Sequence, residues 1–432
     1  MPYSNINPLP TSGIVPGTTT GHVTGHYAQN DVINQLAAQS DDRLVTLEAA
    51  LGSAEVTPRG IYLDSFSGTD DARLTSAIAA QQAAAGMPPI VLGARNHSFN
   101  QTRTLYSGLK LVGPAASGPK NLELASSNYV PARVTLGAAV SSGTASWWVS
   151  PGADCYDIFM ADFAVAGNSG SSVHQFLDFP TTNTLYACEF RSLSFNFMRS
   201  VFGRKDRVCA FTQVVLSGHW TVNNLWDTQF TLGGSDNSLW MGGYVNMGPS
   251  SSAAQTGTYA DNDYEIILSS LSNTNVGYVY CTALNGWRGL RITGSSGNGL
   301  NFYGGVYEGY KGNTTSLTAG PAPGSVIRIE GGAGAFFGPN VGQAMNNPDA
   351  AEGGYIHMTG GEWSIYSPTF YRGLLAETVP CIYQTGGRLL VQGATRRQNE
   401  TWTARPRFTT SATGPNATQT SFYCPDQSMV TT

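Results

Sequence analysis

Apolar and polar residues alternate along most of this chain, and one alternating phrase returns three times. Each copy places apolar side chains two residues apart and ends in two glycines. The copies occupy residues 326–332, 355–361 and 381–387. Their central isoleucines, Ile327, Ile356 and Ile382, are 29 and 26 residues apart. A period of two is that of a β-strand. A strand and turn that recur at this interval predict a solenoid, an all-β fold whose coils stack along one axis.

The same alternation extends well beyond the three copies. Further strands are predicted at 159–165, 190–195 and 212–216, and a looser copy of the phrase at 289–294. Together these runs predict solenoid coils over residues 134–391. The last part, 392–432, is polar and rich in threonine, and it predicts a C-terminal cap.

A short helix is predicted ahead of the coils, within an entry segment at 59–133. Thr69 is a suitable N-cap, and Asp70 and Asp71 follow in the first turn, where carboxylates suit the helix dipole. The expected apolar face consists of Leu74, Ile78 and Ala85. A helix in this place would seal the exposed end of a solenoid.

Residues 31–58 predict a second, different helix with its linker. Its apolar and small residues follow alternating steps of four and three, which is a heptad seam. The seam consists of Ile33, Ala37, Ser40, Leu44, Leu47 and Leu51. A helix of this length is marginal alone in water. It therefore packs on its own domain or on copies of itself, and the absence of adjoining globular sequence favours self-association as a coiled coil.

Composition narrows the classes of partner. Charged residues make up 12% of the 432 residues, and the net charge of −5 includes no basic stripe. Phosphate backbones need such a stripe, so nucleic acid is an unsuitable partner. The chain contains 51 glycines, and with its serine, threonine, asparagine and aromatic residues it suits neutral sugars better.

The first residues and the cysteines indicate where the protein is made. Residues 1–30 form an extended, nearly uncharged arm, and we expect no secretory signal peptide and no transmembrane segment. The six cysteines form no Cys-x-x-Cys pair. Buried thiols are favoured over a metal site or disulfide framework, and production in a reducing cytosol is expected.

The segment from Asp64 to Asp71, with its helix and the strands Ile90–Leu92 and Leu109–Gly113, resembles the entry of the pectate-lyase-like right-handed β-helix family. With the preceding heptads and arm, the chain resembles minor tail proteins and tailspikes of bacteriophages. The resemblance implies a right-handed parallel β-helix, a homotrimer, and attachment to other phage tail proteins through the N-terminus. Family members include lyases, glycoside hydrolases and inert adhesins, so catalysis stays open.

Hydrolysis of a polysaccharide would need two carboxyl groups, and a metal-free lyase would need a Lys, Arg or His base. The candidate acids are Asp227, Asp236, Asp263, Glu265 and Glu308. Alternation places Asp261, Asp263 and Glu265 on one face, where they could bind Ca²⁺, act as acid and base, or form a solvated loop. No other cofactor is expected. Aligning the glycine pairs stacks Glu330 over Thr359 and Thr385, and Glu362 over Arg388, so no second acid lies beside these two.

Aromatic residues concentrate in the middle and late coils. The candidates for stacking on sugar rings are Trp220, Trp226, Trp240, Trp287, Tyr307 and Tyr310, with Trp363 in the same part of the chain. Each could instead belong to an aromatic ladder inside the coils or between protomers.

The sequence therefore predicts a virion component: a homotrimeric tail-fibre or tailspike-like protein, assembled in the host cytoplasm, that contacts a host cell-surface polysaccharide without membrane insertion. The alternative is an envelope polysaccharide depolymerase, a hydrolase or lyase. A secreted plant-type pectate lyase fits less well, because of the heptads and the expected lack of a signal peptide.

Overall fold

The chain divides into two units, residues 1–59 and 60–432, and the structure describes parts of the second. The computed structural model describes residues 60–114, 132–137, 146–167, 174–179, 182–196, 198, 200–203, 208–217, 221–223, 230–233, 239–240, 243–247, 264–269, 273–283, 288–294, 299–309, 325–342, 354–371, 382–396, 408–410 and 421–423. The predicted arm and coiled-coil helix lie outside these ranges.

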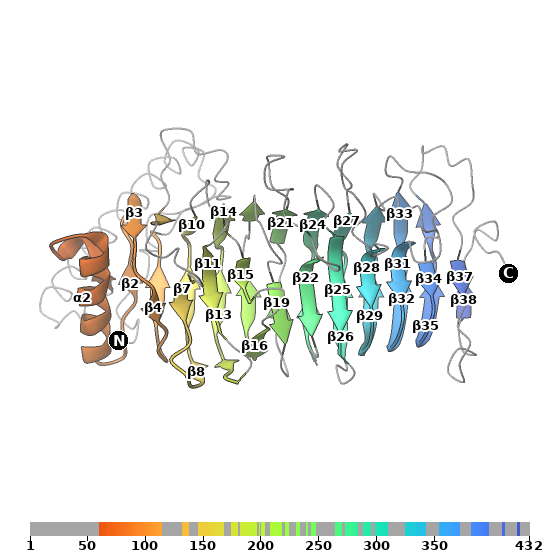
Figure 1. Cartoon of the computed structure of the whole chain (residues 1–432), viewed down its shortest axis with the longest axis horizontal. Coiled ribbons are helices and arrows are strands. Elements are labelled where there is room, and N and C mark those ends of the chain that lie inside the picture. Colours follow the sequence, from red (N-terminus) through yellow and green to blue (C-terminus); the bar gives the residue numbers. More distant parts are fainter. Residues whose placement is uncertain are drawn as a thin grey trace, which may run out of the picture. The chain divides into compact units, whose positions relative to one another are not determined.

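The described residues form three sheets (Figure 1), and one short 3-10 helix and one α-helix lie between the first two strands of the first sheet. The first sheet consists of β1 (Ile61–Tyr62), β2 (Ile90–Val91), β5 (Lys110–Val112), β9 (Phe159–Ala161), β13 (Glu189–Arg191), β17 (Val215–Ser217), β20 (Leu239–Trp240), β23 (Asn275–Val276), β26 (Leu300–Tyr303), β29 (Ala333–Phe337), β32 (Glu362–Tyr366), β35 (Arg388–Gln392) and β38 (Ser421–Tyr423). The second sheet consists of β3 (Asn96–Phe99), β6 (Arg133–Leu136), β10 (Ala164–Ala166), β14 (Ser194–Asn196), β18 (Thr221–Asn223), β21 (Gly243–Met247), β24 (Val279–Ala283), β27 (Val306–Gly309), β30 (Asn340–Gly342), β33 (Thr369–Tyr371) and β36 (Thr395–Arg396). The third sheet consists of β4 (Arg103–Thr104), β7 (Ser146–Val149), β11 (Gln175–Asp178), β15 (Ser200–Phe202), β19 (Phe230–Gly233), β22 (Tyr264–Ser269), β25 (Arg288–Thr293), β28 (Ser325–Ile329), β31 (Gly354–Met358), β34 (Ile382–Gln384) and β37 (Phe408–Thr410), extended by β8 (Cys155–Tyr156), β12 (Leu185–Tyr186) and β16 (Cys209–Thr212).

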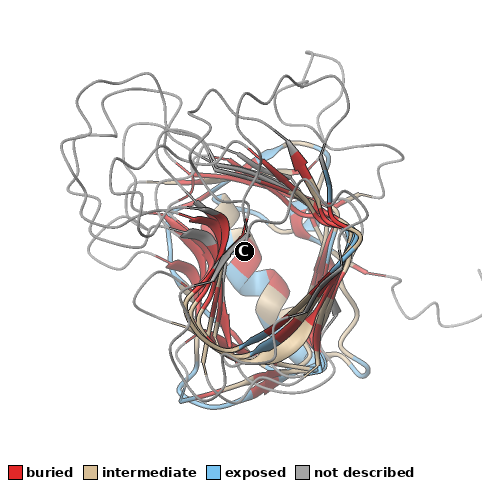
Figure 2. Cartoon of the chain, turned by 90° about the vertical axis from the view of Figure 1, so that its right-hand side faces the viewer, coloured by how far each residue is buried: buried red, intermediate tan, exposed pale blue. Residues whose placement is uncertain are grey.

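The chain passes through the three sheets in turn, and each pass is called a coil below. The described strands pair in parallel with their counterparts in adjacent coils, as β28 does with β31 and β31 with β34. The register is the predicted one: Ile327 pairs with Ile356, and Ile356 with Ile382. Looking along the stack, the strands surround a common core (Figure 2). The repeated phrase is therefore the third-sheet strand of successive coils.

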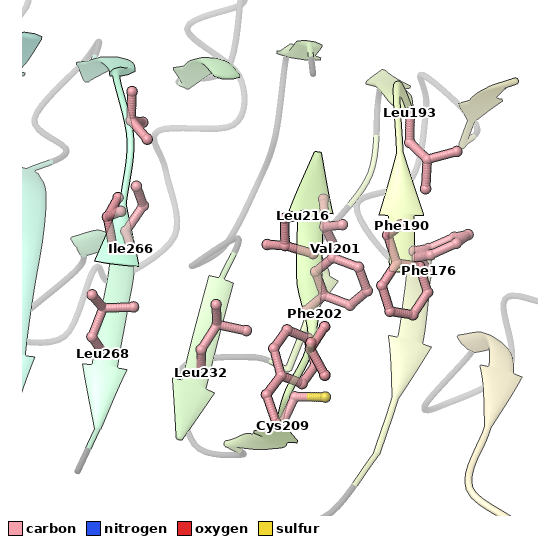
Figure 3. Packing of buried hydrophobic residues seen from close by; sticks show 14 of the residues in the cluster. Phe176, Phe190, Leu193, Val201, Phe202, Cys209, Leu216, Leu232, Ile266 and Leu268 are labelled. Atoms are coloured by element: carbon pink, nitrogen blue, oxygen red, sulfur yellow. The ribbon is translucent and has the colours of Figure 1, made fainter. Parts of the chain in front are cut away.

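Aromatic side chains fill much of this core. In the earlier coils, Phe190 and Phe202 pack edge to face with ring centroids 4.9 Å apart (Figure 3). In the later coils, Phe302 and Phe336 stack face to face, with centroids 4.3 Å apart. The first contact joins strands of two sheets across the core, and the second joins equivalent positions of adjacent coils. Such aromatic contacts stabilise the stack beyond the burial of apolar area.

The corners between strands differ from the prediction. The run 159–165 is two strands of different sheets, β9 and β10, and the run 190–195 is likewise β13 and β14. At the corners Asp162 and Ser192 take left-handed backbone conformations, with φ of 65° and 50°. The next residues, Phe163 and Leu193, are buried. The last core residue before each corner is Met160 or Phe190, so the inward side chains step by three residues across the corner and not by two.

The glycine pairs close tight turns after the third-sheet strands. Gly332, Gly361 and Gly387 have φ of 72°, 89° and 77°, which glycine adopts at little cost. The amide of Glu362 donates to the carbonyl of Gly332 (2.9 Å), and that of Arg388 donates to the carbonyl of Gly361 (2.8 Å). The turns thus stack directly on one another.

The predicted helix is α2 (Asp70–Ala83), preceded by the short 3-10 helix η1 (Leu63–Ser65). Thr69 is the N-cap, and its hydroxyl accepts a hydrogen bond from the Ala72 amide (3.3 Å). The buried residues of the helix are Asp71, Leu74, Ala77 and Gln81. The expected face was partly wrong: Ile78 is half-buried, and Ala85 is exposed because the helix ends before it.

Asp70 joins this helix to the first coil through Arg95. One guanidinium nitrogen of Arg95 lies 2.6 Å from both Asp70 Oδ1 and Asp64 Oδ1. The Ser98 amide donates to Asp70 Oδ2 (2.8 Å). Hydrogen bonds with Arg95 hold the pKa of Asp64 below its usual value. At Asp70 burial acts in the opposite direction, but Arg95 and the Ser98 amide still keep the pKa low.

Asp71 makes a second connection. Its Oδ2 accepts a hydrogen bond from the Asn100 amide (2.8 Å), and its Oδ1 pairs with Arg103 (3.2 Å). Arg103 also donates to Thr75 Oγ1 (2.7 Å) on the same helix. The acidic motif therefore fastens the helix to the first coil, and its charges are occupied by this structural role.

The sheets continue past residue 391. Strands β36, β37 and β38 pair with β33, β34 and β35 and extend all three sheets, as far as Tyr423 in the first. The polar character of this segment led us to predict a separate cap from residue 392, whereas its described strands belong to the coils.

Candidate functional site

Most of the acidic candidates lie outside the described residues. Asp227, Asp236, Asp261 and Asp263 belong to this group. Glu265 lies in β22 and Glu308 in β27, where the backbone alone is described. A calcium site or acid pair at these positions therefore stays a prediction.

The aromatic candidates divide in the same way. Trp220, Trp226, Trp287 and Tyr310 lie outside the described residues, and for Trp240 in β20 the backbone alone is described.

Tyr307 and Trp363 are described and both are buried in the core. Tyr307 shares an inward row with Val341, and its ring meets Phe336 edge to face. The indole of Trp363 donates to the Gly331 carbonyl (3.0 Å). Tyr307 therefore leaves the set of sugar-stacking candidates, because its position in β27 points inward.

A different row of aromatic residues lies on the outside of the first sheet. Tyr303, Phe337 and Tyr366 follow one another in register on β26, β29 and β32. Their rings stack with centroids 5.2 Å apart and 9° between planes. Tyr303 is 49% and Phe337 38% exposed. Large exposed apolar side chains in one group are typical of an interaction site.

Uncharged residues, three of them polar and one an alanine, lie beside this ladder. Asn275, Asn301, Ala335 and Ser364 are in register on the same sheet, two residues before the aromatic row on the later strands. The Asn301 amide donates to Asn275 Oδ1 (3.4 Å). We call these rows together, with the exposed Tyr278 of the adjoining corner, the neutral face.

The neutral face ends at a charged pair. Glu362 pairs in register with Arg388, and their charged atoms are 3.8 Å apart. This confirms the predicted stacking of these two residues. Both side chains are exposed, so the ion pair contributes little to stability.

A charged group lies on the third sheet. Arg291 and Arg328 are in register on β25 and β28, and His357 follows on β31. Glu330 Oε2 accepts from Arg291 (2.9 Å), and Glu330 Oε1 lies 2.6 Å from Arg328 Nε. Thr359 and Thr385 continue the row of Glu330, as predicted, and their backbone amides donate hydrogen bonds to carbonyls of the preceding coil (2.8 Å each). We call Arg291, Arg328 and Glu330 the arginine cluster.

Neither surface pairs two acids. In the outer rows just described, Glu362 and Glu330 each face arginine, whereas glycoside hydrolysis uses two carboxyl groups about 5–9.5 Å apart. His357 is buried, and burial with the charge of Arg328 lowers its pKa to about 4. These rows are suited to binding.

Metal ligands and reactive thiols do not gather in the described part. Its His, Cys, Asp and Glu residues include no group of three placed to hold a metal ion. Cys155, Cys188 and Cys209 are free and buried, and burial raises the pKa of Cys155 to about 11 and of Cys188 to about 12. Among the described helices, none has the length and apolar character of a membrane span.

The sequence contained a signal for the aromatic ladder. Tyr303, Phe337 and Tyr366 each follow an inward apolar residue and precede a turn that begins with glycine or serine. The glycine-pair phrase drew attention to the third sheet, and this shorter phrase on the first sheet was missed.

Comparisons with known proteins bear on the fold. No family model and no curated protein sequence matches the chain. Among solved structures, DFA-IIIase from Arthrobacter chlorophenolicus A6 without its lid is 10% identical, with 80% of this chain and 100% of that chain covered and a TM-score of 0.51. The surface adhesin PfbA of Streptococcus pneumoniae is 9% identical, with coverage of 82% and 91% and a TM-score of 0.32. Tailspike protein 3 of bacteriophage CBA120 is 13% identical, with coverage of 85% and 61% and a TM-score of 0.29. The similarity to DFA-IIIase is one of fold alone, and the two lower scores carry no further conclusion.

Proposed function

We propose that this chain is a tail-fibre or tailspike-like minor tail protein of a bacteriophage, whose coils form a right-handed parallel β-helix and bind a host cell-surface glycan. Residues 1–30 would attach it to other tail proteins, and the helix within 31–58 would hold three copies together. The resemblance of the entry segment and the heptads supports the phage setting. The neutral face supports the glycan.

The exposed aromatic ladder is the observation that carries the binding proposal. The rings of Tyr303, Phe337 and Tyr366 cover one another's faces where they stack, so the ladder offers mainly ring edges as contact surface. The aromatic stack ends at Gln392, which follows Tyr366 in register. Apolar ring atoms beside hydroxyls and amides match the mixed surface of a neutral sugar, which carries both C–H and O–H groups.

Replacing the ladder should weaken glycan binding. We expect the triple variant Tyr303→Ser, Phe337→Ser, Tyr366→Ser to bind its best polysaccharide at least about tenfold more weakly, since interface energy concentrates in aromatic contacts. The measurement is biolayer interferometry against a panel of bacterial envelope polysaccharides, actinobacterial ones included.

A matched control is present in earlier coils. Tyr156 and Tyr186 also stack, 5.1 Å apart, and Tyr156 is 46% exposed. The double variant Tyr156→Ser, Tyr186→Ser should bind as the wild type does. Equal loss in both variants, or no binding to any polysaccharide, would refute the role of the ladder. New reducing ends or unsaturated uronate absorbance in the same incubations would favour a depolymerase.

The proposed trimer has its own test. Deleting residues 31–51 should lower the mass measured by light scattering from three copies toward one, because the heptad seam would supply the contacts between protomers. An unchanged mass would show that the coils associate without that helix.

A further inference from the structure

The arginine cluster carries more positive charge than its structural role requires. Arg291 and Arg328 are directly opposite each other on adjacent coils, an arrangement that is unfavourable for like charges. Glu330 compensates one of the two charges by contacting both guanidinium groups. The Glu362–Arg388 pair of the first sheet, by contrast, matches one acid with one base. The cluster therefore retains a net charge of about +1.

The contacts within the arginine cluster leave N–H donors of both guanidinium groups for a ligand. Glu330 accepts hydrogen bonds from Nε and Nη2 of Arg291, and it lies within ion-pair distance of Arg328 Nε without hydrogen-bond geometry. A guanidinium has five N–H donors, so the outer edges of both groups lie beyond these contacts. Glu330 also fixes the orientation of both side chains, which reduces the conformational entropy that binding would cost.

The cluster is also partly shielded from water. The side chains of Arg291, Arg328 and Glu330 are 23%, 21% and 21% exposed, whereas Arg388 is 46% exposed. Attraction between charges is stronger where water is partly excluded. The next side chain of the row, His357, is buried and neutral at pH 7, because its pKa is about 4. It therefore neither adds to nor offsets the charge.

We propose that Arg291 and Arg328 together bind an oxyanion, a carboxylate or a phosphate, carried by the polysaccharide that this protein contacts. The proposal rests on the proposed function and narrows the polymer to an acidic one. Paired guanidinium groups suit planar or tetrahedral oxyanions, to which they donate two parallel hydrogen bonds. The site is separate from the neutral face, since it lies on the third sheet.

Binding to three immobilised polymers tests this inference. The probes are hyaluronan, which carries carboxylates, phosphomannan, which carries phosphates, and neutral dextran. At low salt we expect one acidic polymer or both to bind at least about tenfold more tightly than dextran, with an advantage that falls as salt rises. Which acidic polymer binds identifies the oxyanion.

The decisive variant is Arg291→Gln, Arg328→Gln, which should lose about tenfold to a hundredfold in affinity for the acidic polymer. The matched control is Arg191→Gln, Arg388→Gln, which changes the net charge equally at two exposed arginines away from the cluster. Arg291→Lys, Arg328→Lys retains the charge without the planar fork, so it should show an intermediate loss. Light scattering and thermal unfolding of each variant verify the fold.

Three outcomes would overturn the inference: dextran binding as tightly as the acidic polymers, the acidic polymers failing to bind, or the control losing as much as the cluster variant. The proposed function fails separately. If the ladder variant loses binding to an envelope polysaccharide while the arginine variant does not, glycan binding stands and the acidic site falls.

Discussion

Replacing Gly361 by alanine is expected to lower the free energy of unfolding by about 3–5 kcal/mol, combining overpacking with left-handed strain. A Cβ atom at this position would lie 2.5 Å from the carbonyl oxygen of Gly332 and 2.7 Å from that of Gly331. The backbone there has φ of 89°, which strains any residue with a side chain. Because the obstructing atoms are backbone of the adjacent coil, relief would require the coils to separate.

Gly338→Ala is the matched control. Gly338 also has a positive φ, 65°, but a Cβ there meets no atom within 4 Å. It should therefore cost the conformational strain alone, about 1–2 kcal/mol. Urea unfolding followed by tryptophan fluorescence compares the two variants. Equal losses in the free energy of unfolding would mean that these turns need glycine for its backbone conformation and not for close stacking of the coils.

Replacing Asp70 by asparagine is expected to cost about 2–4 kcal/mol and to loosen α2 from the first coil. The Asp70 side chain is 12% exposed and lies 2.6 Å from the Arg95 guanidinium. It also accepts the Ser98 amide. Asparagine retains one acceptor oxygen but removes the charge that compensates a partly buried arginine. Circular dichroism melting and hydrogen exchange of residues 70–83 measure the loss.

The variant Asp64→Asn tests whether burial or contact distance sets the strength of an ion pair with Arg95. Asp64 lies equally close to Arg95, at 2.6 Å, but is 41% exposed. Its replacement should cost less than about 1 kcal/mol, as is usual for exposed ion pairs. A loss as large as that of Asp70→Asn would show that distance alone, without burial, sets the strength of this connection.

Lowering the pH should weaken the connection that Asp64 and Asp70 make to the first coil. The pKa values of Asp64 and Asp70 are lower in the folded chain than their ordinary value of 3.8. Their contribution is therefore present above about pH 4 and is lost as the pH falls through the folded pKa values. Asp70→Asn should flatten this part of the pH dependence, whereas the wild type should lose stability in that range.

The sequence predicted the features that depend on local sterics and on repetition. The register of Ile327, Ile356 and Ile382 follows from the spacing of the glycine pairs, because each pair must stack on the last. The capping helix follows from Thr69 and the two aspartates after it. In both cases neighbouring residues fix the backbone conformation, so the sequence pattern alone predicts the feature.

The corners and the end of the sheets could not be predicted in the same way. All residues of the run Phe159–Val165 except Asp162 are apolar, but the side chains in the core are Met160, Phe163 and Val165, with a step of three where Asp162 turns the chain from one sheet into the next. The inward direction is defined relative to the core, and it rotates with the chain at each corner. The apolar run by itself therefore leaves open which of its side chains enter the core and where one strand stops.

The candidate surfaces show most clearly the difference between what the sequence determines and what the tertiary structure decides. The sequence by itself determined that strands recur, that a helix precedes them and that Glu362 stacks over Arg388. The tertiary structure alone decided which aromatic residues face solvent: Tyr307 is inside, whereas Tyr303, Phe337 and Tyr366 are outside. It alone also placed Glu330 against both Arg291 and Arg328, a contact that aligning the copies of the phrase does not give. Exposure and proximity between coils depend on the length of every intervening turn, and no local pattern encodes that length.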